Sequence, residues 1–119
     1  RTLYDIVAPE NIDGFLHENA HDVTAVVHMG AISATTERDA DLIVDTNFRL
    51  SRDLWRFCAA TGTPFVYASS AATYGDGAEG FDDDMSPDAL AALSPLNAYG
   101  WSKLLFDRWV ARELATDLA

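Results

Sequence analysis

The sequence predicts an α/β fold in which parallel strands alternate with helices. Two short apolar runs, at residues 24–28 and 64–69, have the length and composition of buried strands. Each run ends in small residues, and a segment with helical periodicity follows it after a loop. That alternation is typical of a sheet with parallel strands, and 119 residues suit a single globular unit.

The first half of the chain contains a strand, two helices and a second, less marked strand. Residues 2–7 favour a strand and residues 10–20 a helix that precedes the strand at 24–28. A long helix is predicted from about Glu37 to Ala60, because its apolar residues recur at three- and four-residue steps. Gly62 and Pro64 then form a helix stop signal.

The second half is a strand, a long loop and another long helix. After the strand at 64–69, glycines, prolines and an acidic run predict a loop with one helical turn near residues 87–93. A helix begins at about Leu96 or Asn97. It carries one apolar stripe, formed by Trp101, Leu104, Leu105, Trp109, Val110 and Leu114.

Composition excludes several classes of partner. Eight basic residues face nineteen acidic ones, and a net charge of -11 repels nucleic acid. No apolar run approaches the roughly 18 residues of a membrane span, and the N-terminal residues lack a secretory pattern. The single cysteine, Cys58, is expected in a helix core, and its use fits a reducing, cytoplasmic setting.

No metal site is predicted. His17, His21 and His28 lack the spacing of metal ligands, and His28 is expected to bridge backbone groups at the end of its strand. The acidic run at 82–84 lacks the alternate-position ligands of a calcium loop, so a solvated loop is expected there.

Two strand ends are the expected place for ligand chemistry, because open α/β sheets bind ligands beyond the carboxyl ends of their strands. They are "HMGAIS" at residues 28–33 and "ASSAATYG" at residues 68–75. Both are rich in small and hydroxyl residues, which allow close approach to the backbone and form hydrogen bonds. A plain turn also needs small residues, but two such ends on neighbouring strands favour the ligand-binding interpretation.

A tyrosine and a lysine four residues apart open the last helix. Tyr99 and Lys103 share one helix face. One interpretation is an ordinary half-buried tyrosine beside a solvated lysine. In the other, the ammonium makes the phenol a usable acid/base, since a free tyrosine with a pKa of about 10 is a poor base at neutral pH. With a serine from the strand-end loop, such a set removes a proton from an alcohol while a hydride leaves its carbon.

Three blocks carry a family resemblance: "GAISATTE", "YASSAATYG" and "NAYGWSKLLFD". Together they resemble the extended short-chain dehydrogenase/reductase superfamily, and within it the ADP-heptose 6-epimerase family. The resemblance implies a Rossmann-type doubly wound parallel sheet, of which residues 1–119 supply the central part of one domain. Strand order 3-2-1-4-5-6 would make residues 3–7 strand three and residues 24–28 strand four.

The resemblance also implies a mechanism of transient oxidation at carbon 6 of an ADP-heptose, with tightly bound NADP (NAD is the alternative). Tyr99 would be the acid/base, Lys103 its partner on the nicotinamide ribose, and Ser70 the hydrogen-bond donor to the reacting oxygen. Asn47 is expected to brace the backbone. The expected cofactor contacts are Met29, Gly30, Ala31, Ile32, Ser33, Thr46, Tyr99 and Lys103, and Ser33, Ser70 and the segment from Ala71 to Thr73 are expected to face the sugar.

Relatives are separated by the residues that come after the strand-end serine. Sugar-nucleotide dehydratases carry an acidic pair there, whereas "SSAATYG" has no carboxylate. A UDP-hexose 4-epimerase and a non-catalytic dinucleotide-binding module stay open as alternatives. The sequence contains no G-x-x-G-x-x-G turn, so we expect the isolated chain to bind NADP weakly. The family strand order would place two further strands between residues 3–7 and 24–28, so we expect the isolated chain to be marginally stable. The full-length enzyme is expected to be a homo-oligomer.

Overall fold

The computed structural model describes residues 5–117, and its centre is a two-stranded parallel sheet. Strand β1 (Val26–His28) pairs with β2 (Phe65–Tyr67) in a register that places Val27 opposite Val66. Helix α3 (Leu50–Thr61) lies between the strands in the chain, as a parallel crossover requires. The predicted α/β class is confirmed, although each strand is shorter than its apolar run.

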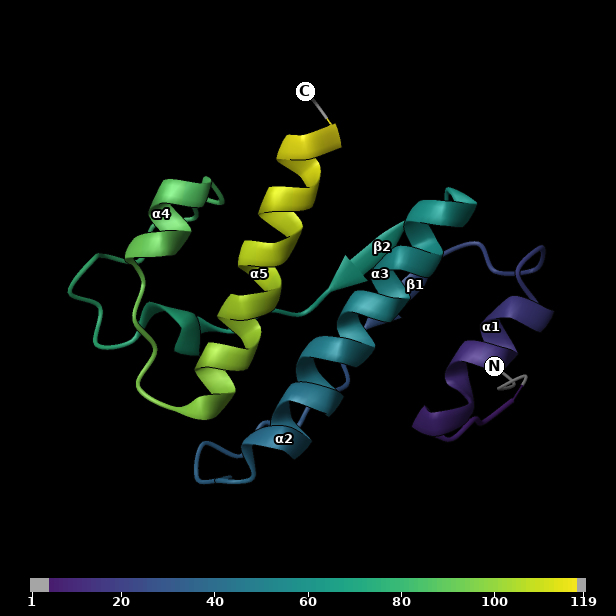
Figure 1. The fold of residues 1–119 in the computed structure, drawn as a ribbon, viewed down its shortest axis with the longest axis horizontal. Coiled ribbons are helices and arrows are strands. Elements are labelled where there is room, and N and C mark those ends of the chain that lie inside the picture. The colour runs from purple at the N-terminus through teal and green to yellow at the C-terminus, as the bar shows by residue number, and fades with distance from the viewer. Residues whose placement is uncertain (1–4, 118–119) are drawn as a thin grey trace.

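Helices cover one face of the sheet (Figure 1). Helices α3 and α5 (Ala98–Asp117) lie side by side, with α1 (Ile12–Glu18) beyond α3 and α4 (Pro87–Ala92) beyond α5. The buried cluster between α1, α3 and the sheet consists of Leu16, Leu54, Phe57 and Cys58. Cys58 is 3% exposed, which confirms its expected place in the core.

The opposite face of the sheet is open in the described part of the chain. Val27 and Val66 are 62% and 58% exposed, and they stand opposite each other in the two strands. Side chains alternate between the faces of a strand, so their neighbours point toward α3 and α5. In a doubly wound sheet helices cover both faces, and residues 5–117 supply one of these two layers.

The long helix predicted from Glu37 begins later and changes its winding. It starts as α2 (Ala40–Ile43), where the Asp39 side chain accepts a hydrogen bond from the backbone of Leu42 at 3.0 Å. A π-helical segment, η2 (Val44–Arg49), then leads into α3. Gly62 ends the helix in the left-handed conformation with φ of 68°, as the stop signal predicted.

The strand predicted at residues 2–7 is absent in the part of it that the structure describes, residues 5–7. Its first residues lie outside the described part, and Asp5–Val7 form no strand because no neighbouring backbone pairs with them. A single turn, η1 (Pro9–Asn11), leads into α1, which is shorter than the predicted helix at 10–20. No helix in residues 5–117 is long and apolar enough to cross a membrane.

Arg108 fastens α4 to α5. Its guanidinium donates to the carbonyl oxygens of Leu90, Ala91 and Leu93 at 2.9, 3.2 and 3.1 Å. These carbonyls lie at the end of α4, where the helix itself supplies no partners. The long loop that follows β2 is thus anchored to the helix that carries Tyr99 and Lys103.

Candidate active site

Ser70 stands at the start of a short turn that follows β2. Its side chain accepts a hydrogen bond from the backbone of Ala72 at 3.1 Å and so caps the turn η3 (Ala71–Tyr74). The Thr73 hydroxyl donates to the Ser70 carbonyl at 2.8 Å. Small hydroxyl residues in "SSAATYG" therefore build a compact turn, as the strand-end pattern predicted.

Gly100 allows this turn to contact the first turn of α5. A Cβ atom placed on Gly100 would lie 2.8 Å from the carbonyl oxygen of Ala72 and 2.8 Å from the Cβ of Pro95. Contacts this short leave no room for a side chain. Because Gly100 has no side chain, the turn that begins at Ser70 can pack against the helix turn that contains Tyr99.

Lys103 is buried on the inner side of α5. Its side chain is 2% exposed, its Nζ donates to the carbonyl oxygen of Ala68 at 2.8 Å, and the ammonium lies 4.6 Å from the centre of the Tyr67 ring. Tyr99, one turn earlier, is half-buried. The interpretation of Lys103 as a solvated lysine is therefore wrong.

The charge of Lys103 is opposed by burial and supported by Asp107. Burial lowers the pKa of Lys103, and the carboxylate of Asp107 partly offsets that change. Burial raises the pKa of Asp107, which is 7% exposed, while the Ser69 hydroxyl and the charge of Lys103 act in the opposite direction. Ser69 donates to Oδ2 of Asp107 at 2.6 Å.

Two further titratable side chains face this group from the strands. The Tyr67 hydroxyl is buried without a hydrogen-bond partner in the described residues, and burial followed by the charge of Asp107 raises its pKa. His28 is 6% exposed, and burial followed by the charge of Lys103 lowers its pKa. Its Nε2 is bonded to the Ser51 hydroxyl at 2.9 Å, so it pairs with a side chain and not with the expected backbone groups.

Asn47 connects the first strand-end loop to α5. Its Oδ1 accepts from the backbone nitrogen of Ile32 at 2.8 Å, and its Nδ2 donates to the Ile32 carbonyl at 2.9 Å and to the Ser102 hydroxyl at 3.0 Å. Ser102 donates onward to the carbonyl oxygen of Tyr99 at 2.7 Å. Asn47 is fully buried and braces the backbone as expected, and the loop at 29–33 is thereby tied to the Tyr99 turn.

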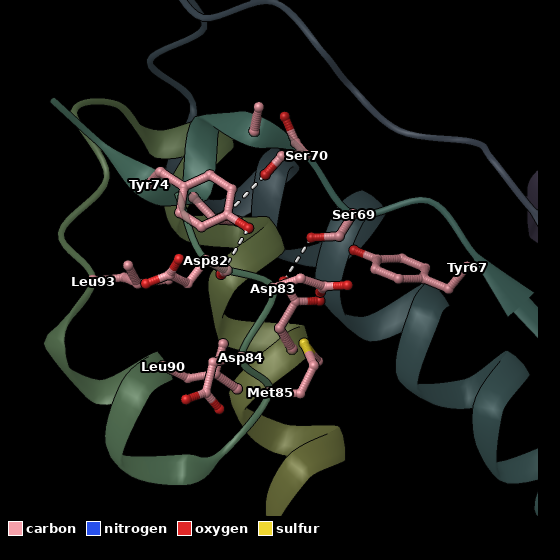
Figure 2. A pocket seen from close by; sticks show the side chains of 13 residues that line it. Tyr67, Ser69, Ser70, Tyr74, Asp82, Asp83, Asp84, Met85, Leu90 and Leu93 are labelled. Atoms are coloured by element: carbon pink, nitrogen blue, oxygen red, sulfur yellow. Dashed lines mark hydrogen bonds between the residues drawn. The ribbon is translucent and has the colours of Figure 1, made fainter. Parts of the chain in front are cut away.

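A cavity of about 530 Å³ opens beside the strand exit. Figure 2 shows Tyr67 and Ser69 on one side of it and Tyr74 and Leu93 on the other. Ser70, Ala71 and Thr73, three of the residues expected to face the sugar, line it, as does the exposed acidic run Asp82–Asp84. Within residues 5–117, no group of three acidic, histidine or cysteine side chains is placed to hold a metal ion.

The structure places Thr46 away from this cavity. Thr46 lines a second cavity of about 520 Å³ between α1 and the η2–α3 helix, together with side chains of both elements. Its expected cofactor contact stays a prediction. Ser33 is exposed and is not among the residues that line the first cavity, so its two expected roles also stay predictions.

The loop at 29–33 and the Tyr99–Lys103 turn fit a dinucleotide by their donor set and their surface. Met29 is 74% exposed, and a Cβ on Gly30 would meet only the His28 ring, at 3.7 Å or more, so the surface is open to a flat ligand. The phenol of the half-buried Tyr99 is suited to a ribose hydroxyl, and the ammonium of Lys103, one turn later, is buried and donates to the Ala68 carbonyl. These residues would hold a nicotinamide dinucleotide at the carboxyl edge of the strands.

Sequence reasoning missed the supporting polar residues of the site, Ser69, Ser102 and Asp107. Each hydrogen-bonds a partner 3 to 55 residues away in the chain, and sequence spacing carries no signal for the longer of these separations. Ser102 and Asp107 do interrupt the apolar face of α5, and polar residues at inward positions are the one sequence signal that points to them.

A family model described as "NAD dependent epimerase/dehydratase family" matches residues 2–116. The chain belongs to this family. The match spans both strand ends, Asn47 and the Tyr99–Lys103 turn of this epimerase/dehydratase chain.

Two bacterial relatives carry the same name. An ADP-L-glycero-D-manno-heptose-6-epimerase of Fusobacterium nucleatum subsp. nucleatum is 50% identical over 115 residues, which cover 95% of this chain and 35% of that protein. The protein of that name from Nitratidesulfovibrio vulgaris is 60% identical over 92 residues, which cover 77% of this chain and 28% of that protein. This epimerase/dehydratase chain spans about a third of the length of the curated relatives it matches.

Two solved structures share the fold. The ADP-L-glycero-D-manno-heptose-6-epimerase of Helicobacter pylori aligns with a TM-score of 0.70 at 25% identity, over 90% of this chain and 32% of that one. The UDP-Glc/GlcNAc 4-epimerase of Campylobacter jejuni aligns with a TM-score of 0.68 at 23% identity, over 92% and 32%. The second likeness supports the fold alone, and both support the Rossmann-type sheet predicted for the chain.

Proposed function

We propose that this chain is the central part of a nucleotide-sugar epimerase that inverts carbon 6 of ADP-D-glycero-D-manno-heptose. The observation that carries the proposal is the buried Lys103, one turn after Tyr99. The 50% identity to an ADP-L-glycero-D-manno-heptose-6-epimerase supports it. A lysine with 2% exposure has been removed from water at a cost that packing alone does not explain. A catalytic use of its charge does explain it.

Three side chains carry the proposed chemistry. Tyr99 is proposed to exchange a proton with the sugar hydroxyl, and Lys103 to supply a positive charge one helical turn away. Ser70 begins the turn that Gly100 brings against the Tyr99 helix turn, and its hydroxyl is proposed to bond the same substrate oxygen. Ala71 and the cavity wall would receive the sugar.

A bound nicotinamide dinucleotide would supply the hydride acceptor for this reaction. We propose NADP, with NAD as the alternative, held by residues 29–33, Thr46, Tyr99 and Lys103. We further propose a cytoplasmic homo-oligomer whose ADP-heptose product enters the lipopolysaccharide inner core, and a single dinucleotide-binding domain that includes residues 1–119.

The test compares the complete protein with its Tyr99→Phe variant. We expect wild type to interconvert the two ADP-heptose epimers, and Tyr99→Phe to lose at least about 100-fold in kcat, the lower end for a general acid/base. Trp101→Phe is the control, because this exposed aromatic residue lies on the same helix and does not line the cavity. Turnover of UDP-glucose in place of ADP-heptose would favour the 4-epimerase, and full activity of Tyr99→Phe would favour the non-catalytic module.

A further inference from the structure

Two neighbouring residues at the exit of β2 are held by side chains one turn apart on α5. Lys103 donates to the carbonyl of Ala68 at 2.8 Å, and the Ser69 hydroxyl donates to Asp107 at 2.6 Å (Figure 2 shows the cavity wall that Ser69 forms). Positions 103 and 107 share a helix face, so both bonds act on the same side of the strand exit. The next residue along the chain is Ser70.

Only one of these two bonds is independent of the proposed acid/base pair. Lys103 is also proposed to act beside Tyr99, so its bond to the Ala68 carbonyl belongs to a residue with two roles. The Ser69–Asp107 bond has no such competitor among the proposed catalytic residues. It ties the strand exit to α5 whether or not Lys103 is engaged.

Asp107 is buried, so its carboxylate depends on the hydrogen bond from Ser69. A carboxylate that is 7% exposed loses most of its hydration, which is costly unless hydrogen bonds and opposite charge replace it. Ser69 supplies a short bond to the carboxylate, and the charge of Lys103 lies near enough to act on its pKa. Bonds to an ionised acceptor are about twice as strong as neutral ones.

Resting on the proposed function, we propose that Asp107 is a positioning residue that acts through Ser69 to hold Ser70 in place for Tyr99. A reacting oxygen must meet both hydroxyls at hydrogen-bond distance, and small displacements of either reduce the rate strongly. Asp107 and Ser69 also line the cavity, but in this role Asp107 acts through Ser69 and not by contact with the sugar or the cofactor. It fixes the segment that carries Ser70 to the helix that carries Tyr99.

The first test changes Ser69 in the complete protein. Ser69→Ala is expected to lower kcat for the ADP-heptose about tenfold, with a smaller change in KM and a Kd for NADP within about twofold of wild type, because the orientation of Ser70 is lost and no proposed cofactor contact is removed. Ser69→Thr restores the hydroxyl and is expected to recover kcat to within about threefold of wild type. Ser94→Ala, an exposed serine with its side chain outside the cavity wall, is the matched control and keeps wild-type kcat.

The second test asks whether Ser69 and Asp107 act as a unit. If they do, the kcat of the double variant Ser69→Ala/Asp107→Asn is no lower than the kcat of the less active single variant. Losses that multiply overturn the proposal, as does a Ser69→Ala variant with kcat within twofold of wild type or a Ser69→Thr variant as impaired as Ser69→Ala.

Failure of this inference is distinct from failure of the proposed function. Inactive wild type, or an active Tyr99→Phe variant, contradicts the epimerase function itself. An active wild type with an inactive Tyr99→Phe variant and a fully active Ser69→Ala variant contradicts only the role of Asp107. Titration with NADP and the Tm of each variant confirm that folding is retained.

Discussion

The ammonium nitrogen of Lys103 lies 4.6 Å from the centre of the Tyr67 ring, on the buried side of α5. An aromatic face attracts a cation, and the Ala68 carbonyl and the charge of Asp107 act in the same direction. Burial nevertheless lowers the pKa of Lys103, so the folded protein carries this charge at some expense of stability.

Lys103→Met is therefore expected to separate activity from stability. Loss of the buried ammonium ends its desolvation cost, whereas the Ala68 carbonyl loses its donor and the buried Asp107 loses a nearby opposite charge. These effects partly offset, so the free energy of unfolding should fall by no more than about 3 kcal/mol while kcat falls at least about 100-fold. Denaturant unfolding of the complete protein measures the first and epimerisation the second. A destabilisation above about 3 kcal/mol would contradict the balance, and Arg112→Met, an exposed cation of the same helix, is the control.

Gly100→Ala is expected to lower both stability and kcat, although alanine is the better helix former by about 1 kcal/mol. The new Cβ would lie 2.8 Å from the Ala72 carbonyl and force the Ser70 turn away from Tyr99. Gly14→Ala in α1 is the matched control, because its Cβ would meet no atom within 4 Å, and there we expect a gain of about 0.5–1 kcal/mol. Equal effects of the two substitutions on Tm would contradict the close approach at Gly100.

Asn47→Ala is expected to cost about 2–4 kcal/mol of folding free energy, because it leaves two part-buried backbone groups of Ile32 without partners. The loop at 29–33 should become more mobile and the Kd for NADP should rise. Asn11→Ala is the control, since Asn11 is exposed and makes no capping hydrogen bond. Hydrogen exchange at residues 29–33 and an NADP titration measure the two effects, and unchanged exchange in Asn47→Ala would show that the loop is held in another way.

The pH dependence of stability should have opposite signs at two aspartates. Burial raises the pKa of Asp107, so its contribution to stability is present below its usual pKa near 4 and is lost as pH rises through the raised value. Hydrogen bonds from Ser86 lower the pKa of the exposed Asp84, so its contribution is present above that usual value and is lost as pH falls.

The Tm of each neutral variant, measured against wild type from pH 3 to 7 (a range about the usual carboxyl pKa), tests these signs. Relative to wild type, Asp107→Asn should gain Tm as pH rises and Asp84→Asn should lose Tm. Parallel changes in the two variants would mean that burial does not dominate at Asp107.

The sequence predicted the type of most helices and strands, but it did not predict which residues form their buried faces. The predicted stripe on α5 includes Trp101, Leu105 and Leu114, which are 38%, 43% and 51% exposed. The buried face instead carries Ser102, Lys103 and Asp107 beside Leu104 and Phe106. A periodicity argument assigns apolar residues to the inside, and it fails where a helix buries polar groups that bond the ends of strands.

The helix at 40–61 shows the same effect together with a change of winding. The helix begins at Ala40 and not at the predicted Glu37, because Asp39 caps it. The π-helical segment was not predicted. Asn47 and Ser51 are fully buried although they are polar, since they bond Ile32 and His28 across the fold. No local pattern identifies such partners.

The α/β class, the two strand ends and the Tyr99–Lys103 pair could all be predicted from the amino-acid sequence, because they depend on local composition and on the 3.6-residue helical period. Three other features became known only from the folded chain: Lys103 is buried, Ser69 bonds Asp107, and Asn47 ties the loop at 29–33 to α5. The physical reason is that desolvation and hydrogen bonding depend on which distant segments meet. Spacing along the chain does not contain that information.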